Sequence, residues 1–246
     1  MEHVDRAHAA WQQSLQRPHR TPQGSAAAYG GAGAPRGSQR LEELVPGEVV
    51  ETPVGVCYVV KHIYPIAHTH GAARLGELLM HHPRQLASLH PPSALEEGGD
   101  FSTAAFLDTE TTGLGGAGVY AFMVGVGVFE PCADSGDGMD YVVRQFFMRS
   151  PAEEPAQLYA LAALLNARHV MVTFNGRGFD LPLLRARYAL NRALLPSEIR
   201  RVPLINEGSP HLDLLLPARR LWKRRLQSCR LINLEAEILG LERSQE

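Results

Sequence analysis

The pattern of apolar and polar positions along the chain predicts a sheet that is built in two stages. Between residues 99 and 150, three stretches rich in β-branched and aromatic residues are separated by short Gly- and Asp-containing segments. Such stretches are typical of strands, and consecutive strands joined by short turns form an antiparallel meander. The three predicted strands are residues 104–107, 119–129 and 141–148.

After residue 150 the pattern changes, and helical spacing of leucines alternates with apolar runs of strand length. We expect helices at residues 150–166, 179–190, 217–226 and 234–239, and strands at residues 169–174 and 211–216. An antiparallel three-strand meander followed by βαβ units predicts an α/β fold with a mixed sheet flanked by helices.

The N-terminal part of the chain has a different composition. Residues 18–40 consist largely of Pro, Gly, Ser and Ala, so we expect residues 1–40 to be a disordered tail and linker. Residues 41–98 predict a small accessory unit, with two strands at 48–60 and a helix at 71–82. Pro and Gly residues near its end mark a boundary, which leaves residues 99–246 as the main domain.

Composition limits the class of protein. The 246 residues are 45% hydrophobic, which suffices for one good core. The sequence has no apolar run of membrane-spanning length and no secretory signal at its N-terminus. The three cysteines are widely spaced and form neither a disulfide framework nor a metal-binding pair. We therefore expect a protein of the reducing cytoplasm with no membrane partner; the sequence does not define an oligomeric state.

The formal net charge of −2 hides a basic segment. Residues 168–230 contain 13 Lys and Arg against 4 Asp and Glu, and Lys61 and Lys223 are the only lysines of the chain. Arginine pairs bidentately with phosphate, so this segment indicates a surface that binds a polyanion. An Arg-rich composition set by the base content of the genome explains the charge equally well.

Two carboxylates follow the first predicted strand of the meander. Side chains two residues apart share one face of a strand, so Asp108 and Glu110 are expected side by side. Like charges so close together are costly unless a cation lies between them. The alternative is an edge strand with a solvated acidic tip.

A third carboxylate, Asp180, falls in the first turn of the helix at 179–190. The strands at 104–107 and 169–174 are expected to be neighbours, so Asp180 would face Asp108 and Glu110 at one edge. Three converging carboxylates form a site for a hard cation such as Mg²⁺ or Mn²⁺. The alternative is that Asp180 only stabilises its helix terminus, by under ~1 kcal/mol.

The glycine-rich segment at residues 113–118 matches the G-x-G-x-x-G pattern of dinucleotide-binding folds. That pattern requires a helix after its last glycine, and strand-forming residues follow here. We interpret the match as accidental and expect a tight turn beside the carboxylates.

Four ordered motifs resemble those of the YprB-type ribonuclease-H-like domain, within the Asp-Glu-Asp-Asp exonuclease superfamily. They are LDTETTGLGGAGVYAFMVGVG, VTFNGRGFDLPLL, HLDLLLPARRLW and SCRLINLEAEILG, and the resemblance covers roughly residues 101–240. It implies a ribonuclease-H-like fold and a nuclease, exonuclease-like in type, that hydrolyses DNA or RNA with two Mg²⁺ or Mn²⁺ ions. It also implies that Asp108, Glu110 and Asp180 are the catalytic metal ligands. Asn175 is expected to orient Asp180 or a substrate phosphate, or to be a plain turn residue.

The chain departs from the pattern of this superfamily at the fourth carboxylate. Asp213 is the only Asp after Asp180, and it lies on a predicted strand outside the expected catalytic quartet. Glu235 and Glu237 do not match the expected motif. A truncated product, a member that has lost activity, or an unmatched Glu acting as substitute would each explain this, and binding of the second ion is expected to be weak.

The helix at 217–226 carries a cluster of basic residues that we expect to bind the phosphate backbone. A solvated basic face is the alternative, and Leu221, Trp222 and Leu226 are expected to pack inward. The second functional interpretation is therefore a nucleic-acid-binding module with little or no catalysis. The residues expected to contact phosphate, besides Asn175, are Arg219, Arg220, Lys223 and Arg224.

Overall fold

The computed structural model describes residues 40–89, 99–113, 118–132 and 138–241. The expected disordered tail, the Pro- and Gly-rich boundary at 90–98 and the centre of the glycine-rich turn at 114–117 therefore lie outside the described residues. None of the described helices combines the length and the apolar character that a membrane crossing needs.

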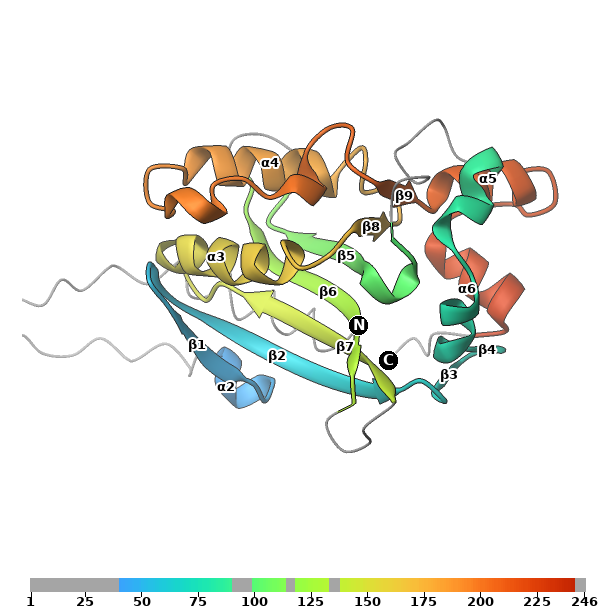
Figure 1. Cartoon of the computed structure of the whole chain (residues 1–246), viewed down its shortest axis with the longest axis horizontal. Helices are drawn as coiled ribbons and strands as arrows, with labels where there is room; N and C mark the ends of the chain where they lie inside the picture. The colour runs from blue at the N-terminus through green and yellow to red at the C-terminus, as the bar shows by residue number, and fades with distance from the viewer. Residues whose placement is uncertain (1–39, 90–98, 114–117, 133–137, 242–246) are drawn as a thin grey trace, which may run out of the picture.

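A seven-stranded mixed sheet with the order β1-β2-β7-β6-β5-β8-β9 forms the centre of the protein (Figure 1). The predicted meander is confirmed: β5 (Ala104–Thr111), β6 (Ala121–Pro131) and β7 (Met139–Phe147) are consecutive and antiparallel. The predicted neighbour of β5 is confirmed as well, because β8 (Val170–Thr173) pairs with it in parallel. The seventh strand, β9 (His211–Asp213), pairs in parallel with β8, which completes the expected α/β sheet.

Two strands of the expected accessory unit extend this same sheet. β1 (Glu48–Thr52) pairs with β2 (Gly55–Pro65), and β2 pairs along its length with β7. The division of the chain at residue 98 stays a prediction, but its first part is joined to the main sheet by backbone hydrogen bonds. The short strands β3 (Thr69–His70) and β4 (Ala73–Arg74) form a separate hairpin.

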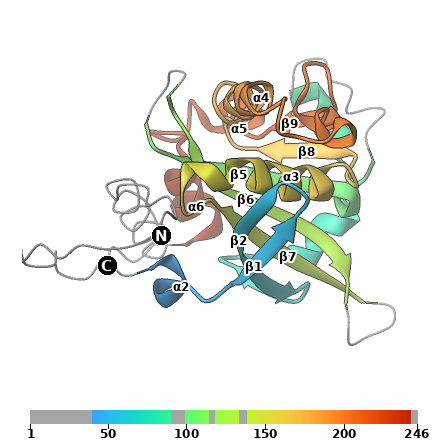
Figure 2. The same cartoon turned by 90° about the vertical axis from the view of Figure 1, so that its left-hand side faces the viewer.

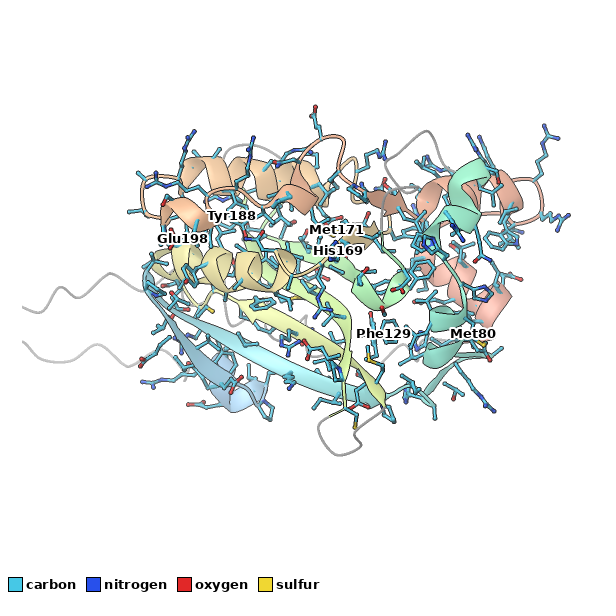
Figure 3. All side chains as sticks on the ribbon, viewed as in Figure 1. Met80, Phe129, His169, Met171, Tyr188 and Glu198 are labelled. Carbon is cyan, nitrogen blue, oxygen red and sulfur yellow. The ribbon has the colours of Figure 1, made fainter. Side chains whose placement is uncertain are left out.

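One face of the sheet is covered by α3 (Glu154–Leu165) and α4 (Asp180–Leu190), which lie side by side in Figures 1 and 2. Figure 3 shows Tyr188 and Met171 in the layer between these helices and the strands, and both are buried. The same core contains Ala105 and Leu107 of β5. Alternate residues of β5 point to the other face, where Ala104 and Phe106 pack near β8 and β9.

The remaining helices are short and lie around the sheet. α5 (Leu215–Trp222) and α6 (Leu231–Leu239) lie at the end of the sheet opposite α2 (Leu41–Leu44), on the right of Figure 1. The helix expected at 71–82 is a shorter 3₁₀ helix, Leu75–Met80. It starts later than expected because Gly71 and Ala72 form the turn of the β3–β4 hairpin. The other 3₁₀ helices are Pro83–Leu89, Phe101–Thr103, Pro151–Glu153, Ser197–Ile199 and Pro203–Ile205.

Candidate functional site

The end of β5 presents its two acidic side chains to one face of the sheet. Asp108 is exposed and Glu110 is half-buried, whereas Thr109 between them is buried toward α4. The alternation of side chains along β5 therefore places Asp108 and Glu110 together, as the sequence predicted.

Asp180 is the first residue of α4 and only 4% exposed. The Thr109 hydroxyl donates a hydrogen bond to Oδ1 of Asp180 at 2.5 Å, which ties the start of α4 to β5. Burial raises the pKa of Asp180 to about 6, the bond from Thr109 opposes this rise, and the charge of Asp108 adds to it. Asp108 is thus near enough for its charge to disfavour ionisation of Asp180.

The three predicted ligands lie at the same end of the sheet, but the structure does not bring their carboxylates together. Asp108 and Glu110 share the face opposite Thr109, and Thr109 holds Asp180 on the helical side. Within the ranges that the structure describes, no three His, Cys, Asp or Glu side chains are grouped so that they could hold a metal ion.

The loop between β8 and α4 is fixed by the buried carboxylate of Asp213. Its Oδ1 accepts the backbone N–H of Asn175 at 2.8 Å and of Leu215 at 3.1 Å, and its Oδ2 accepts that of Arg177 at 3.1 Å. These bonds stabilise the left-handed backbone of Asn175, whose φ is 69°. They also turn the chain from β9 into α5, which is why the strand expected at 211–216 ends at residue 213.

Gly176 in this loop lies against the side chain of Thr173. A Cβ at this position would lie 2.6 Å from the Thr173 side chain, so the close approach requires glycine. The Thr173 hydroxyl accepts the Gly176 N–H at 3.2 Å and pairs with Nε2 of buried His211 at 2.8 Å. The loop is therefore held at both ends by buried polar contacts.

A pocket of about 580 Å³, which we call the polar pocket, lies between β5, this loop, α5 and the start of α6. Of the predicted site residues, Asp108, Asn175 and Arg219 line it. Arg230 also lines it and was missed by the sequence interpretation, although it belongs to the basic segment at 168–230. The complete lining consists of Asp108, Phe174, Asn175, Leu215, Arg219, Ser228, Cys229, Arg230 and Leu231.

The other residues that were expected to bind phosphate lie on α5 or just after it in the chain, and they do not line the polar pocket. Lys223 and Arg224 are exposed to solvent. Arg220 is exposed as well, but its guanidinium donates a hydrogen bond to the carbonyl oxygen of Ser88 at 2.8 Å. Arg220 thus joins α5 to the 3₁₀ helix Pro83–Leu89. The inward packing expected for Leu221 is wrong, because this side chain is 42% exposed.

Comparison with known proteins places the part of the chain that carries the polar pocket within one family. The RNase_H superfamily profile matches residues 105–246, which include β6 to β9, all of β5 except Ala104, and the complete lining of the polar pocket. The "Uncharacterized protein YprB" of Bacillus subtilis (strain 168) is 32% identical over 197 residues, which cover 77% of this chain and 42% of that protein. The chain therefore spans less than half the length of this relative. The profile match agrees with the strand order and confirms the resemblance seen in the motifs: the chain belongs to the RNase_H superfamily.

Proposed function

We propose that this protein is a divalent-metal-dependent, exonuclease-like nuclease that hydrolyses phosphodiester bonds of DNA or RNA. The observation that carries the proposal is the polar pocket, in which the exposed carboxylate of Asp108 shares one lining with Arg219 and Arg230. A phosphodiester needs positive groups to hold its anionic oxygens and a carboxylate-bound cation to polarise it. Both kinds of side chain line this one pocket.

The basic side chains are assigned to the substrate. A guanidinium binds two phosphate oxygens through parallel N–H bonds, so Arg219 and Arg230 are placed to hold the backbone beside Asp108. Asn175 lines the same pocket on a loop fixed by Asp213, and it is proposed to contact a phosphate. Arg220, Lys223 and Arg224 are proposed to contact the backbone farther along the strand.

Asp108, Glu110 and Asp180 are proposed to hold Mg²⁺ or Mn²⁺. The raised pKa of Asp180 fits this role, because a buried carboxylate in the field of Asp108 gains most from a nearby cation. When bound, a pair of such ions activates a water molecule and neutralises charge on the departing oxygen. Within the protein, the Thr109 hydroxyl holds the Asp180 carboxylate, and this bond must open or be shared for all three acids to meet one ion.

A second candidate function is a nucleic-acid-binding module with weak or no catalysis. One specific observation favours it: the acids of the described residues form no three-membered group that could hold a metal ion. Both functions use the same polar pocket, and a cytoplasmic location stays a prediction for either.

One cleavage experiment separates the two functions. End-labelled single- and double-stranded DNA and RNA are incubated with Mn²⁺ and the wild type, Asp108→Asn or Glu51→Gln. Glu51 is an exposed acid on the edge strand β1, so its variant is a matched control for the loss of one negative charge. Cleavage by the wild type and the control, but not by Asp108→Asn, supports the nuclease. Equal cleavage by all three contradicts it, and binding without cleavage in all three supports the second function.

A further inference from the structure

The outward side of α4 is exposed to solvent but carries almost no charge. α4 lies at the outside of the molecule, at the top of Figures 1 and 2. A surface helix ordinarily buries one apolar stripe and presents charged or polar side chains on its opposite side. α4 buries Leu181, Leu184 and Tyr188 in the core, but the side chains on its opposite side are apolar as well. We call this exposed surface the α4 face, and its residues are Pro182, Ala186, Ala189, Leu190, Ala193 and Leu194.

The α4 face extends beyond Leu190, the last residue of α4, because the turn that follows is also helical. The N–H of Asn191 donates to the carbonyl oxygen of Arg187 at 3.0 Å, and the N–H of Leu195 donates to that of Asn191 at 3.2 Å. These bonds have the spacing of four residues that defines an α-helix. Leu190 and Leu194 are therefore neighbours on one side of the helical segment. They are 63% and 61% exposed, and adjoining exposed apolar side chains of this size mark an interaction site.

The charges around the α4 face decide which partner fits it. Among residues 180–200, the exposed charged side chains are Arg192, Glu198 and Arg200. Arg200 donates from Nε to the carbonyl oxygen of Leu195 at 2.7 Å, so its charge balances the negative end of the helical segment. One free positive and one free negative side chain remain, and neither forms an ion pair within the part of the chain that the structure describes.

This balance of charges favours a second copy of the chain over a nucleic acid. A nucleic-acid backbone binds to surfaces with an excess of positive charge, which the α4 face lacks. A second copy of the same surface offers Glu198 to Arg192 and Arg192 to Glu198. Such a contact is isologous, since both copies use the same residues, and it brings together no excess of like charge.

We infer that the α4 face joins two copies of this chain about a two-fold axis, with their α4 helices antiparallel. With Leu190 at the centre of the contact, Ala186 of each copy lies opposite Leu194 of the other, because both are four residues from the centre. A small side chain opposite a large one lets two helices interlock at the usual axis separation of about 8–10 Å. The contact uses no residue that lines the polar pocket, so the inference does not depend on the proposed function.

Sedimentation equilibrium tests the inference on the full chain, in EDTA and without nucleic acid. As its concentration is raised, the wild type is expected to approach twice the monomer mass of 27.0 kDa and not to exceed it, because a two-fold contact is closed. Leu190→Lys would place two ammonium groups opposite each other, and it is expected to raise the Kd of the dimer at least about 100-fold. Leu190 is exposed and lysine suits the C-terminal end of a helix, so the fold of the monomer is retained.

Val49→Lys is the matched control for Leu190→Lys. Val49 is 51% exposed on the edge strand β1 and is not part of the α4 face, so its variant also replaces an exposed apolar side chain by lysine. This variant is expected to dimerise with the Kd of the wild type.

Ala186→Leu distinguishes an interlocked contact from unspecific apolar association. Leucine at this position enlarges the exposed apolar surface, so unspecific association would become tighter. In the antiparallel pair it would occupy the space that Leu194 of the other copy fills, and the overpacking is expected to raise the Kd of the dimer about 10-fold.

Each contrary result rejects a definite part of the inference. A wild type that stays at 27.0 kDa at every concentration would leave the α4 face to a different partner, and the inference would be wrong. Dimers of Leu190→Lys as tight as those of Val49→Lys would place the contact elsewhere on the molecule. Tighter association of Ala186→Leu would reject the antiparallel fit, and assemblies larger than a dimer would reject the two-fold axis. None of these results bears on the proposed nuclease, because sedimentation involves no cleavage.

Discussion

The Thr109 hydroxyl donates a hydrogen bond to the carboxylate of Asp180, and this bond joins the central strand β5 to the first residue of α4. The two residues are 71 positions apart in the chain, and both are buried. The bond stabilises the ionised form of Asp180, whereas burial and the charge of Asp108 oppose ionisation. The ionisation of Asp180 is therefore linked to the stability of the fold.

Asp180→Asn is expected to stabilise the protein at pH 8 in the absence of metal ions. The folded-state pKa of Asp180 is about 6, above the unfolded value of 3.8, so its contribution to stability is fully present below pH 3.8 and is lost as the pH rises through 6. Asparagine carries no charge and keeps an acceptor for Thr109. We expect a free energy of unfolding about 3 kcal/mol higher than that of the wild type at pH 8, and a difference of under about 1 kcal/mol near pH 4.

Urea denaturation between pH 4 and pH 8 measures this difference. Asp108→Asn is a second test, because removal of its charge lowers the pKa of Asp180 and shifts the pH dependence of the wild type to lower pH. A constant difference between Asp180→Asn and the wild type at every pH would contradict the linkage.

Thr109→Val is expected to be destabilising, and more so at high pH. Valine has a similar shape but removes the hydroxyl that supports the buried carboxylate, and an unsatisfied buried group costs about 1–3 kcal/mol. Because the bond from Thr109 lowers the pKa of Asp180, its loss raises that pKa above 6. Thr109→Ser retains a hydroxyl and serves as the control in the same denaturation experiment. If Thr109→Val and Thr109→Ser lower the free energy of unfolding equally, the effect is due to packing and not to the hydroxyl.

Mn²⁺ is expected to raise the melting temperature of the wild type at pH 8. A ligand present at 100 times its Kd stabilises the folded state by about 2.7 kcal/mol, which corresponds to roughly 5–10 °C for a chain of this size. Asp108→Asn and Asp180→Asn are expected to lose most of this shift, and Glu51→Gln is expected to keep it. A shift of equal size in all four proteins, measured by differential scanning calorimetry, would place the ion elsewhere.

The sequence predicted the meander of β5, β6 and β7 because local periodicity and short connections define these strands, and it predicted β8 as a neighbour of β5. The pairing of β2 with β7 was not predictable, because the paired residues are some 80 positions apart and no local pattern says which distant strand lies beside β2. The exposure of Leu221 was missed for another reason. Helical spacing identifies an apolar face but does not say whether a packed core or an open hollow lies beneath it.

The candidate site was predictable only where strand geometry decides it. Alternation along β5 placed Asp108 and Glu110 on one face, whereas the bond between Thr109 and Asp180 depends on the position of α4 over the sheet. Arg230 lies between two helices in a segment with no motif of its own for phosphate, so only the tertiary structure places it in the lining of the polar pocket with Asp108. The role of Asp213 in fixing the loop after β8 was likewise not predictable from the sequence, because its carboxylate accepts backbone N–H groups of a loop distant in the chain.

Asp213→Ala is expected to destabilise the protein and to displace the loop that carries Asn175. The substitution leaves the N–H groups of Asn175, Arg177 and Leu215 without the carboxylate that accepts them. Loss of a buried hydrogen-bond network of this kind costs about 2–4 kcal/mol. Amide hydrogen exchange at the three N–H groups checks the cause, and it is expected to become faster in the variant by more than the loss of global stability explains. Exchange that follows global unfolding alone would contradict a local role.

Arg219→Gln and Arg230→Gln are each expected to weaken binding of DNA or RNA and to reduce its dependence on salt. Both guanidinium groups line the polar pocket beside Asp108, so each is expected to contact one phosphate. Loss of one phosphate contact lowers the slope of log K against log salt concentration by about 1. Arg192 is exposed and outside the pocket, and Arg192→Gln is expected to leave the slope unchanged. The slopes are measured by titrating labelled single strands at several KCl concentrations in EDTA. Equal slopes for Arg219→Gln, Arg230→Gln and Arg192→Gln would mean that the backbone binds to a general basic surface, and the polar pocket would then lose its assigned role.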